Sequence, residues 1–61
     1  MYFVQYVYEV VGDYSVAEEL GAVMLDEISD SIEEIARKIS IKTNHNVLSI
    51  SEIQNFENKF S

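Results

Sequence analysis

The 61-residue chain contains no cysteine, no proline and no tryptophan, and it has only two glycines and one histidine. The absence of cysteine excludes disulfides, and one imidazole without a thiol leaves none of the usual zinc ligand sets. A domain of this size buries only roughly 60% of the surface that its unfolded chain exposes, so its stability is marginal without further burial. We therefore expect a homodimer or a bound partner protein.

The sequence also lacks a long apolar run and a basic leader. No stretch approaches the ~20 apolar residues that a membrane helix needs, and the opening residues carry no basic group. We therefore expect a cytoplasmic protein that makes no contact with a membrane.

Positive charge is scarce and unevenly placed. Residues 1–36 hold nine acids and no base, whereas residues 37–61 hold four bases and two acids. Phosphate binding needs clustered Lys and Arg, so the sequence argues against direct nucleic-acid binding. The acidic part either faces a basic protein surface or simply keeps the protein soluble.

Residue sets for catalysis are missing as well. His45 is the only imidazole, and we expect it in a turn after a helix, exposed to solvent. The acid pairs are sequential neighbours that point in different directions, and no glycine-rich phosphate loop occurs. The sequence therefore predicts a protein that is not an enzyme, with no catalytic, cofactor-binding or metal-binding residues.

What the chain does contain begins with an apolar strand at residues 2–11, "YFVQYVYEVV". Tyr, Phe and Val dominate it, and Gly12-Asp13 ends it with a turn signal. One face would pack under a helix, and the other would be left for self-association. We assign the first face to Tyr2, Val4, Tyr6, Tyr8 and Val10, and the self-association face to Phe3, Val7 and Val11.

Residues 15–28 are ambiguous between strand and helix. Ser15 and Glu18 have the spacing of a helix capping box, but Gly21 costs about 1 kcal/mol inside a helix. The segment also suits a strand that returns from a hairpin with a loop near residues 12–19. We favour the strand, because the first strand needs a neighbour.

Residues 30–43 show the clearest helical pattern, capped by Asp30 or Ser31 and ended by Asn44-His45-Asn46. Residues 47–56 resume a strand pattern that we extend to about residue 54, although a short terminal helix is the alternative over residues 51–60. In this strand Leu48 and Ile50 alternate against Val47 and Ser49, and a bulge near Ser51-Glu52 would bring Ile53 into phase. The buried helix face is predicted to comprise Ile32, Ile35, Ala36 and Ile39.

These elements assemble into one small α+β domain over residues 1–61. The order is strand, strand, helix, strand (ββαβ), and a crossover through the helix brings the last strand beside the first. We expect a three-stranded antiparallel sheet of order 2-1-3 with one helix on one face.

This layout resembles a loose set of small accessory proteins encoded by bacteriophages and prophages. The matching stretches are the opening strand "YFVQYVY" at residues 2–8, the step "DEISD" at residues 26–30, and "IEEI" at residues 32–35. Residues 13–20 depart from the resemblance, because they are longer and more acidic than its glycine-rich hairpin. The resemblance implies a phage accessory role against host defences and a location in the host cytoplasm, and it transfers no functional residues.

The acidic residues supply the candidate contact surface. We expect a small acidic protein-binding module, an inhibitor or adaptor that blocks a basic, nucleic-acid-binding surface of a host protein; the alternative is a structural subunit that only assembles with itself. The candidate partner-binding residues are Asp13, Tyr14, Glu18, Glu19, Asp26 and Glu27.

Overall fold

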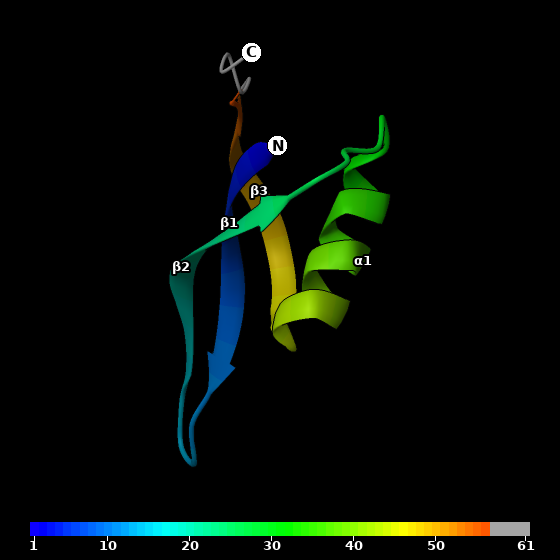
Figure 1. Cartoon of the computed structure of the whole chain (residues 1–61). Helices are drawn as coiled ribbons and strands as arrows, with labels where there is room; N and C mark the ends of the chain where they lie inside the picture. Colours follow the sequence, from blue (N-terminus) through cyan, green and yellow to red (C-terminus); the bar gives the residue numbers. More distant parts are fainter. Residues whose placement is uncertain (57–61) are drawn as a thin grey trace.

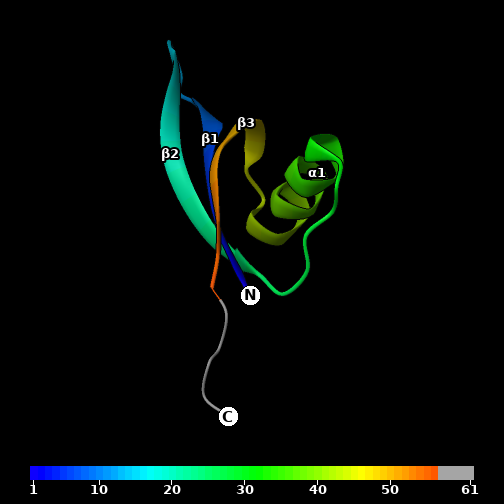
Figure 2. The same ribbon diagram turned by 90° about the horizontal axis from the view of Figure 1, so that it is seen from above.

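The computed structural model describes residues 1–56 and has the expected α+β architecture. Three antiparallel strands form a sheet of order β2-β1-β3, and the helix α1 packs on one face (Figures 1 and 2). No helix in this part of the chain has the length and apolar character to cross a bilayer. The elements are β1 (Tyr2–Val11), β2 (Val16–Leu25), α1 (Ile32–Thr43) and β3 (Asn46–Asn55).

The hairpin between β1 and β2 is tighter than expected. Residues 16–25 form a strand, so the helical alternative suggested by Ser15 and Glu18 is wrong. The predicted loop over residues 12–19 shrinks to four residues, closed by the Gly12 N–H donating to the Ser15 carbonyl at 2.8 Å. Ten consecutive residue pairs then join the two strands without an irregularity. Pairing with β1 therefore outweighs the local capping pattern.

Gly21 makes room for an aromatic ring on the neighbouring strand. It pairs with Tyr6, and a Cβ added at Gly21 would lie 2.6 Å from Tyr6 Cζ. The ring of Tyr6 thus lies across the glycine, and Tyr6 is only 1% exposed. Glycine weakens a helix, but at this position its lack of a side chain permits close packing in the sheet.

Local signals set both ends of α1. Ser31 caps the first turn, and its hydroxyl accepts from the Glu34 N–H at 3.4 Å. Asn44 adopts the left-handed conformation (φ 60°), and its N–H donates to the Ser40 carbonyl at 2.8 Å. Both ends agree with the sequence prediction.

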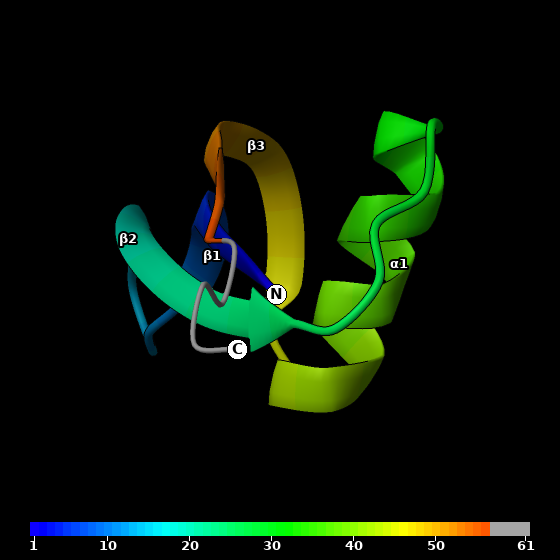
Figure 3. The ribbon, with the colours of Figure 1, turned by 45° about the horizontal axis from the view of Figure 1, so that its top comes forward.

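The buried face of α1 is narrower than the pattern indicated. Ile35 and Ile39 are buried and Ala36 is half-buried. Ile32, predicted to be buried, is 55% exposed because it occupies the first helical position, at the end of the connection from β2. Figure 3 shows that connection crossing from the end of β2 to the start of α1.

Strand β3 contains two bulges. The register with β1 shifts between Gln5 and Tyr6, opposite Ser51, where a bulge was expected. A second shift between Val7 and Tyr8 leaves Leu48 without an opposite residue. The expectation that Leu48 shares a side of the strand with Ile50 is therefore wrong. Because of this bulge, Leu48 is exposed, while Val47 and Ile50 pack against the core. The strand assignment therefore holds through Asn55, and the part of the terminal-helix alternative beyond residue 56 lies outside the described residues.

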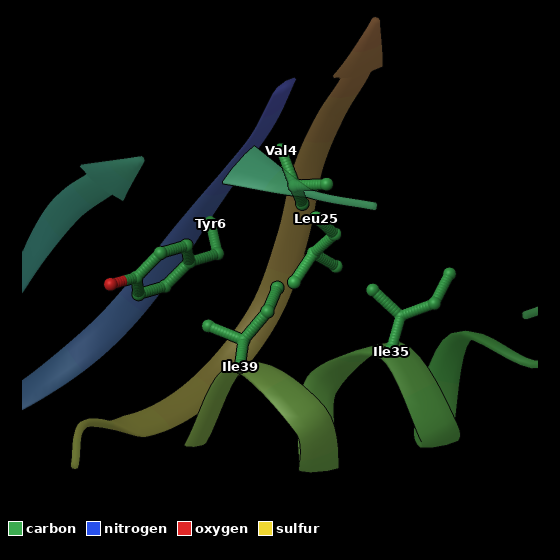
Figure 4. Packing of buried hydrophobic residues seen from close by; sticks show 5 residues of the cluster. All are labelled: Val4, Tyr6, Leu25, Ile35 and Ile39. Carbon is green, nitrogen blue, oxygen red and sulfur yellow. The ribbon is translucent and has the colours of Figure 1, made fainter. Parts of the chain in front are cut away.

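The hydrophobic core lies between α1 and the sheet. Figure 4 shows side chains from α1 reaching toward those of the sheet. Tyr2 and Tyr8 pack at the margin of this cluster, as expected for the even-numbered face of β1, whereas Val10 is exposed beyond it. The buried residues are Val4, Tyr6, Leu25, Ile35 and Ile39.

The end of the hairpin projects beyond the rest of the domain. Pairing of β1 with β3 stops at Glu9 and Asn46, so residues 10–17 continue as a two-stranded ribbon (Figure 1). Exposed Val11 and Val16 face each other across this ribbon. It therefore offers apolar surface that β3 and α1 do not cover.

Candidate protein-binding face

One face of the sheet is covered by α1, and the other is covered by no element within residues 1–56 (Figure 2). We call the second the helix-free face. Side-chain alternation and the two pairing registers assign its members. From the start of β1 toward the hairpin, its rows across β2, β1 and β3 are Met24–Phe3–Gln54, Ala22–Gln5–Glu52, Leu20–Val7–Ser49, Glu18–Glu9–Asn46 and, without β3, Val16–Val11.

Apolar side chains on this face are open to solvent. Leu20 is 72% exposed, Val11 67% and Val16 64%. Val7, at the centre of the sheet, is half-buried by its neighbours on the three strands. The row Glu18–Glu9–Asn46 separates Leu20 from Val11 and Val16, so the face carries two exposed apolar groups with polar residues between them. Exposed apolar surface rimmed by polar residues marks an interaction site more often than an ordinary surface does.

Phe56 extends the apolar surface at the other end of the sheet. Its N–H donates to the Met1 carbonyl at 2.9 Å, which continues the pairing of β1 and β3. Its ring meets Phe3 edge to face, with 6.2 Å between the ring centroids. The predicted self-association residues Phe3, Val7 and Val11 thus all lie on the helix-free face, as the alternation of β1 indicated.

The charge of the helix-free face has one sign. Glu9 and Glu18 lie directly opposite each other, and Glu52 stands on β3. Like charges in directly opposed positions destabilise a strand pair. The Asn46 amide reaches Glu9 Oε1 at 3.4 Å, but no Lys or Arg within residues 1–56 belongs to this face. A cationic side chain from another protein would relieve the repulsion between Glu9 and Glu18.

The bases lie elsewhere. Within the described residues they are Arg37, Lys38 and Lys42, all on α1. Lys42 extends from α1 to β2, where its ammonium donates to the Met24 carbonyl at 3.0 Å. Glu33 and Glu34 lie in the first turn of α1, so this helix carries charges of both signs, whereas the helix-free face carries acids without a base in the described part of the chain.

The structure divides the six predicted contact residues among four places. Glu18 lies on the helix-free face, whereas Glu19 lies on the opposite face, where its Oε2 accepts from the Tyr8 hydroxyl at 3.1 Å. Asp26 and Glu27 follow the end of β2, so roughly 26 Å of strand separates Glu18 from Asp26. The six residues therefore do not form one surface.

The remaining two, Asp13 and Tyr14, occupy the tip of the hairpin. Tyr14 is 100% exposed. The ribbon carries it beyond β3 and α1, where a partner that binds the helix-free face can also reach the tip (Figure 1). Exposed tyrosines are common anchors of protein interfaces.

Opposite the helix-free face, His45 belongs to an aromatic cluster. Its ring stacks on Tyr8 with 3.8 Å between centroids and 2° between planes, and its Nδ1 hydrogen-bonds the Tyr6 hydroxyl at 2.7 Å. The expectation of a solvated turn residue is therefore wrong, although His45 does lie in the turn between α1 and β3. The cluster ties that turn to the centre of the sheet.

The hydrogen bond to Glu19 also changes the acidity of Tyr8. The bond, partial burial and the negative charge of Glu19 raise the pKa of the Tyr8 phenol above its ordinary value of 10.0. The bond is the largest of these causes. It raises the pKa because it is lost when the phenol ionises. Tyr8 thus stays protonated and holds Glu19 as an acceptor.

Among residues 1–56 we find no enclosed pocket and no group of three or more metal-ligating side chains. Sequence reasoning did not assign four residues of the candidate face to a site: Leu20, Val16, Glu9 and Glu52. Only the pairing registers place them beside Val7 and Val11. Comparison with protein families, with curated proteins and with solved structures finds no match to this chain.

Proposed function

We propose that the protein is a non-enzymatic protein-binding module that docks a basic, partly apolar surface of another protein on its helix-free face. The observation that carries this proposal is the combination, on this face, of exposed apolar side chains with Glu9, Glu18 and Glu52 and no base from residues 1–56. Apolar residues supply burial, while the acids select a partner with Lys or Arg at the matching positions.

The mode of action is steric. A sheet face three strands wide covers the basic surface on which it docks and excludes other ligands from it. If that surface normally holds nucleic acid, the module acts as an inhibitor or an adaptor in the cytoplasm. The resemblance to phage accessory proteins supports this form of the proposal and would place the protein in the cytoplasm of the host.

The test compares two charge variants that each lose three carboxylates. The first carries Glu9→Gln, Glu18→Gln and Glu52→Gln on the helix-free face; the control carries Asp26→Asn, Glu27→Gln and Glu33→Gln outside it. Partners captured by the wild-type protein at low salt are identified, and the affinity of the purified partner is measured for each variant. The face variant should lose at least tenfold in affinity and much of its salt dependence, while the control keeps more of both.

The apolar part of the face is tested with Val7→Lys, which puts a base at its centre. A folded Val7→Lys protein should fail to bind the partner. If it binds with wild-type affinity, or if the control charge variant loses as much affinity as the face variant, the helix-free face is not the docking surface.

A second candidate function is a structural subunit that assembles only with itself. The exposed valines of the projecting ribbon favour it, because Val11 and Val16 would be buried by another copy. The two candidates differ in whether another protein binds. A binding module captures a partner at low salt and releases it at high salt, whereas a structural subunit assembles with itself and captures no partner at either salt. Affinity capture at both salt concentrations, with light scattering to follow self-association, measures the difference.

A further inference from the structure

The two edges of the sheet are protected to different degrees. On β3 the register shifts twice, and such bulges hinder pairing with a further strand. On β2 the pairing with β1 runs through ten positions without a shift, and Val16–Leu25 contains no Lys, Arg or Pro. Charged side chains (above all Lys), Pro and bulges are the usual protections of an edge strand, and of these β2 has only the charges of Glu18 and Glu19. The outer edge of β2 is therefore the open one, and Figure 2 shows it on the side of the sheet away from α1.

The hairpin bond shows which backbone groups face outward. Antiparallel pairs alternate between hydrogen-bonded and non-hydrogen-bonded, and the Gly12–Ser15 bond starts the series. The odd-numbered residues of β2 thus bond to β1, and the even-numbered residues direct their N–H and C=O groups outward. The bond from Lys42 to the Met24 carbonyl agrees with this assignment. The outward-facing residues are Val16, Glu18, Leu20, Ala22 and Met24.

We propose that this edge pairs with β2 of a second copy of the chain, antiparallel and about a two-fold axis at Leu20, to form one continuous six-stranded sheet. A two-fold axis keeps both helix-free faces on the same side of the joined sheet. Each of the five outward-facing residues lies opposite a residue in β2 of the second copy only if the axis passes through Leu20. Val16 then faces Met24 of the second copy, Glu18 faces Ala22, and Leu20 faces its own equivalent.

The same register suits the side chains. An axis at Glu19 would place two carboxylates directly opposite each other, whereas the axis at Leu20 places Glu18 beside alanine and Glu19 beside glycine. Leu20, 72% exposed in the single chain, meets Leu20 of the second copy at the centre. The terminal pair is weaker, because Lys42 already occupies the Met24 carbonyl. The chain carries a net charge of −7, so salt should strengthen this dimer by screening repulsion between the copies.

The register is tested by disulfide cross-linking, since the natural chain has no cysteine. Opposed residues in a hydrogen-bonded antiparallel pair have Cα atoms about 5.5 Å apart, which is within disulfide range. Under mild oxidation the Leu20→Cys protein should form a covalent dimer. The Val16→Cys and Met24→Cys proteins should each remain uncross-linked alone and cross-link when mixed.

Denaturant should abolish the differences in cross-linking between these cysteine variants, because the differences depend on pairing of the folded β2 edges. Equal rates for all three single-cysteine proteins in native buffer would overturn the register. Cross-linking of Val16→Cys or Met24→Cys alone, faster than that of Leu20→Cys, would do the same.

The Ala22→Pro variant tests whether the dimer forms through the outer edge of β2. Proline removes the outward N–H of residue 22 and leaves the ladder to β1 intact. The matched control Ala22→Thr keeps the N–H. By analytical ultracentrifugation at high salt, the wild-type protein and Ala22→Thr should be dimers and Ala22→Pro a folded monomer. A wild-type monomer at every concentration and salt tested, or a dimeric Ala22→Pro, overturns the proposal; if Ala22→Pro does not fold, cross-linking through Leu20→Cys decides.

This inference does not rest on the partner-binding proposal. Pairing through the β2 edge leaves the helix-free face open in the dimer. Ala22 belongs to that face, so the partner affinity of Ala22→Pro is compared with that of Ala22→Thr, which replaces the same face residue and keeps the outward N–H. Failure of pairing and failure of partner binding are therefore distinguished by separate variants.

Discussion

The two faces of the sheet carry similar residue types but bury them to different degrees. On the face under α1, Val4 and Tyr6 are almost fully buried, and the Tyr6 ring lies across Gly21. On the helix-free face, Leu20 and Val11 remain mostly exposed. Close packing of side chains distinguishes the covered face, whereas carboxylates at fixed positions among exposed apolar residues distinguish the open face.

Apolar content alone therefore does not locate the core of a small domain. Alternation in β1 produces two apolar faces, and one helix is enough to cover only one of them. Substitutions on the covered face should therefore change stability, whereas those on the open face should change association.

Ile39→Ala, on the buried side of α1, should lower the free energy of unfolding the most. Ile39 is fully buried, and truncation of such a residue costs about 2–5 kcal/mol. A domain of this size has a comparable free energy of unfolding, so the variant should lose its cooperative urea transition. Ile41→Ala, on the exposed side of the same helix, is the control and should change stability by less than about 0.5 kcal/mol. Equal losses in the two variants would contradict the assignment of the core.

A smaller loss is expected when the glycine beneath the aromatic ring is filled. Gly21→Ala would place a Cβ 2.6 Å from Tyr6 Cζ and should cost about 1–3 kcal/mol through displacement of the ring. Gly12→Ala is the matched control, because its Cβ would lie 3.5 Å from the Ser15 carbonyl oxygen, an ordinary contact. Urea titration of both proteins measures the difference. A Gly21→Ala protein as stable as Gly12→Ala would show that Tyr6 does not need the space.

The hydrogen bond between Tyr6 and His45 should contribute about 1 kcal/mol, the usual net value for one bond. Tyr6→Phe keeps the ring and removes the hydroxyl, leaving His45 Nδ1 without this partner. The control Tyr14→Phe alters a fully exposed hydroxyl and should leave the urea midpoint unchanged. If both variants match the wild-type protein, the bond adds nothing to stability.

The smallest effect is a difference in pH dependence above pH 10. The folded protein holds the Tyr8 proton more tightly than the unfolded chain, because its pKa is raised from 10.0 mainly by the bond to Glu19. The resulting stabilisation is present below pH 10 and is lost as pH rises through the raised pKa. In Tyr8→Phe this contribution is absent, so its stability should fall less steeply over that range. Parallel curves for wild type and Tyr8→Phe in thermal melts from pH 8 to 11 would contradict the assignment.

Much of the fold was predictable because its signals are local. Alternation identified β1 and its helix-covered face, and Ser31 and Asn44 identified the ends of α1. The slip in apolar phase near Ser51 correctly indicated a bulge. The second bulge could not be predicted, because exposed Leu48 looks like a core residue until its strand register is known.

The candidate site was less predictable, because it depends on pairing between strands. The acids chosen by proximity in sequence separate onto two faces and both ends of β2. Glu9 and Glu52, far apart in the chain, come onto one face through the registers of β1 with its two neighbours. Similarly, the role of Gly21 follows only from its place opposite Tyr6.

The sheet order 2-1-3 also determines when the fold can be completed. The hairpin of β1 and β2 closes locally, but the third strand must return across most of the chain, pairing Asn55 with Tyr2. Such distant pairing is slow relative to hairpin closure. During synthesis, β1 leaves the ribosome before β3 and therefore waits with one edge unpaired until residue 55 has emerged. Its aromatic residues are the part of the nascent protein most in need of protection.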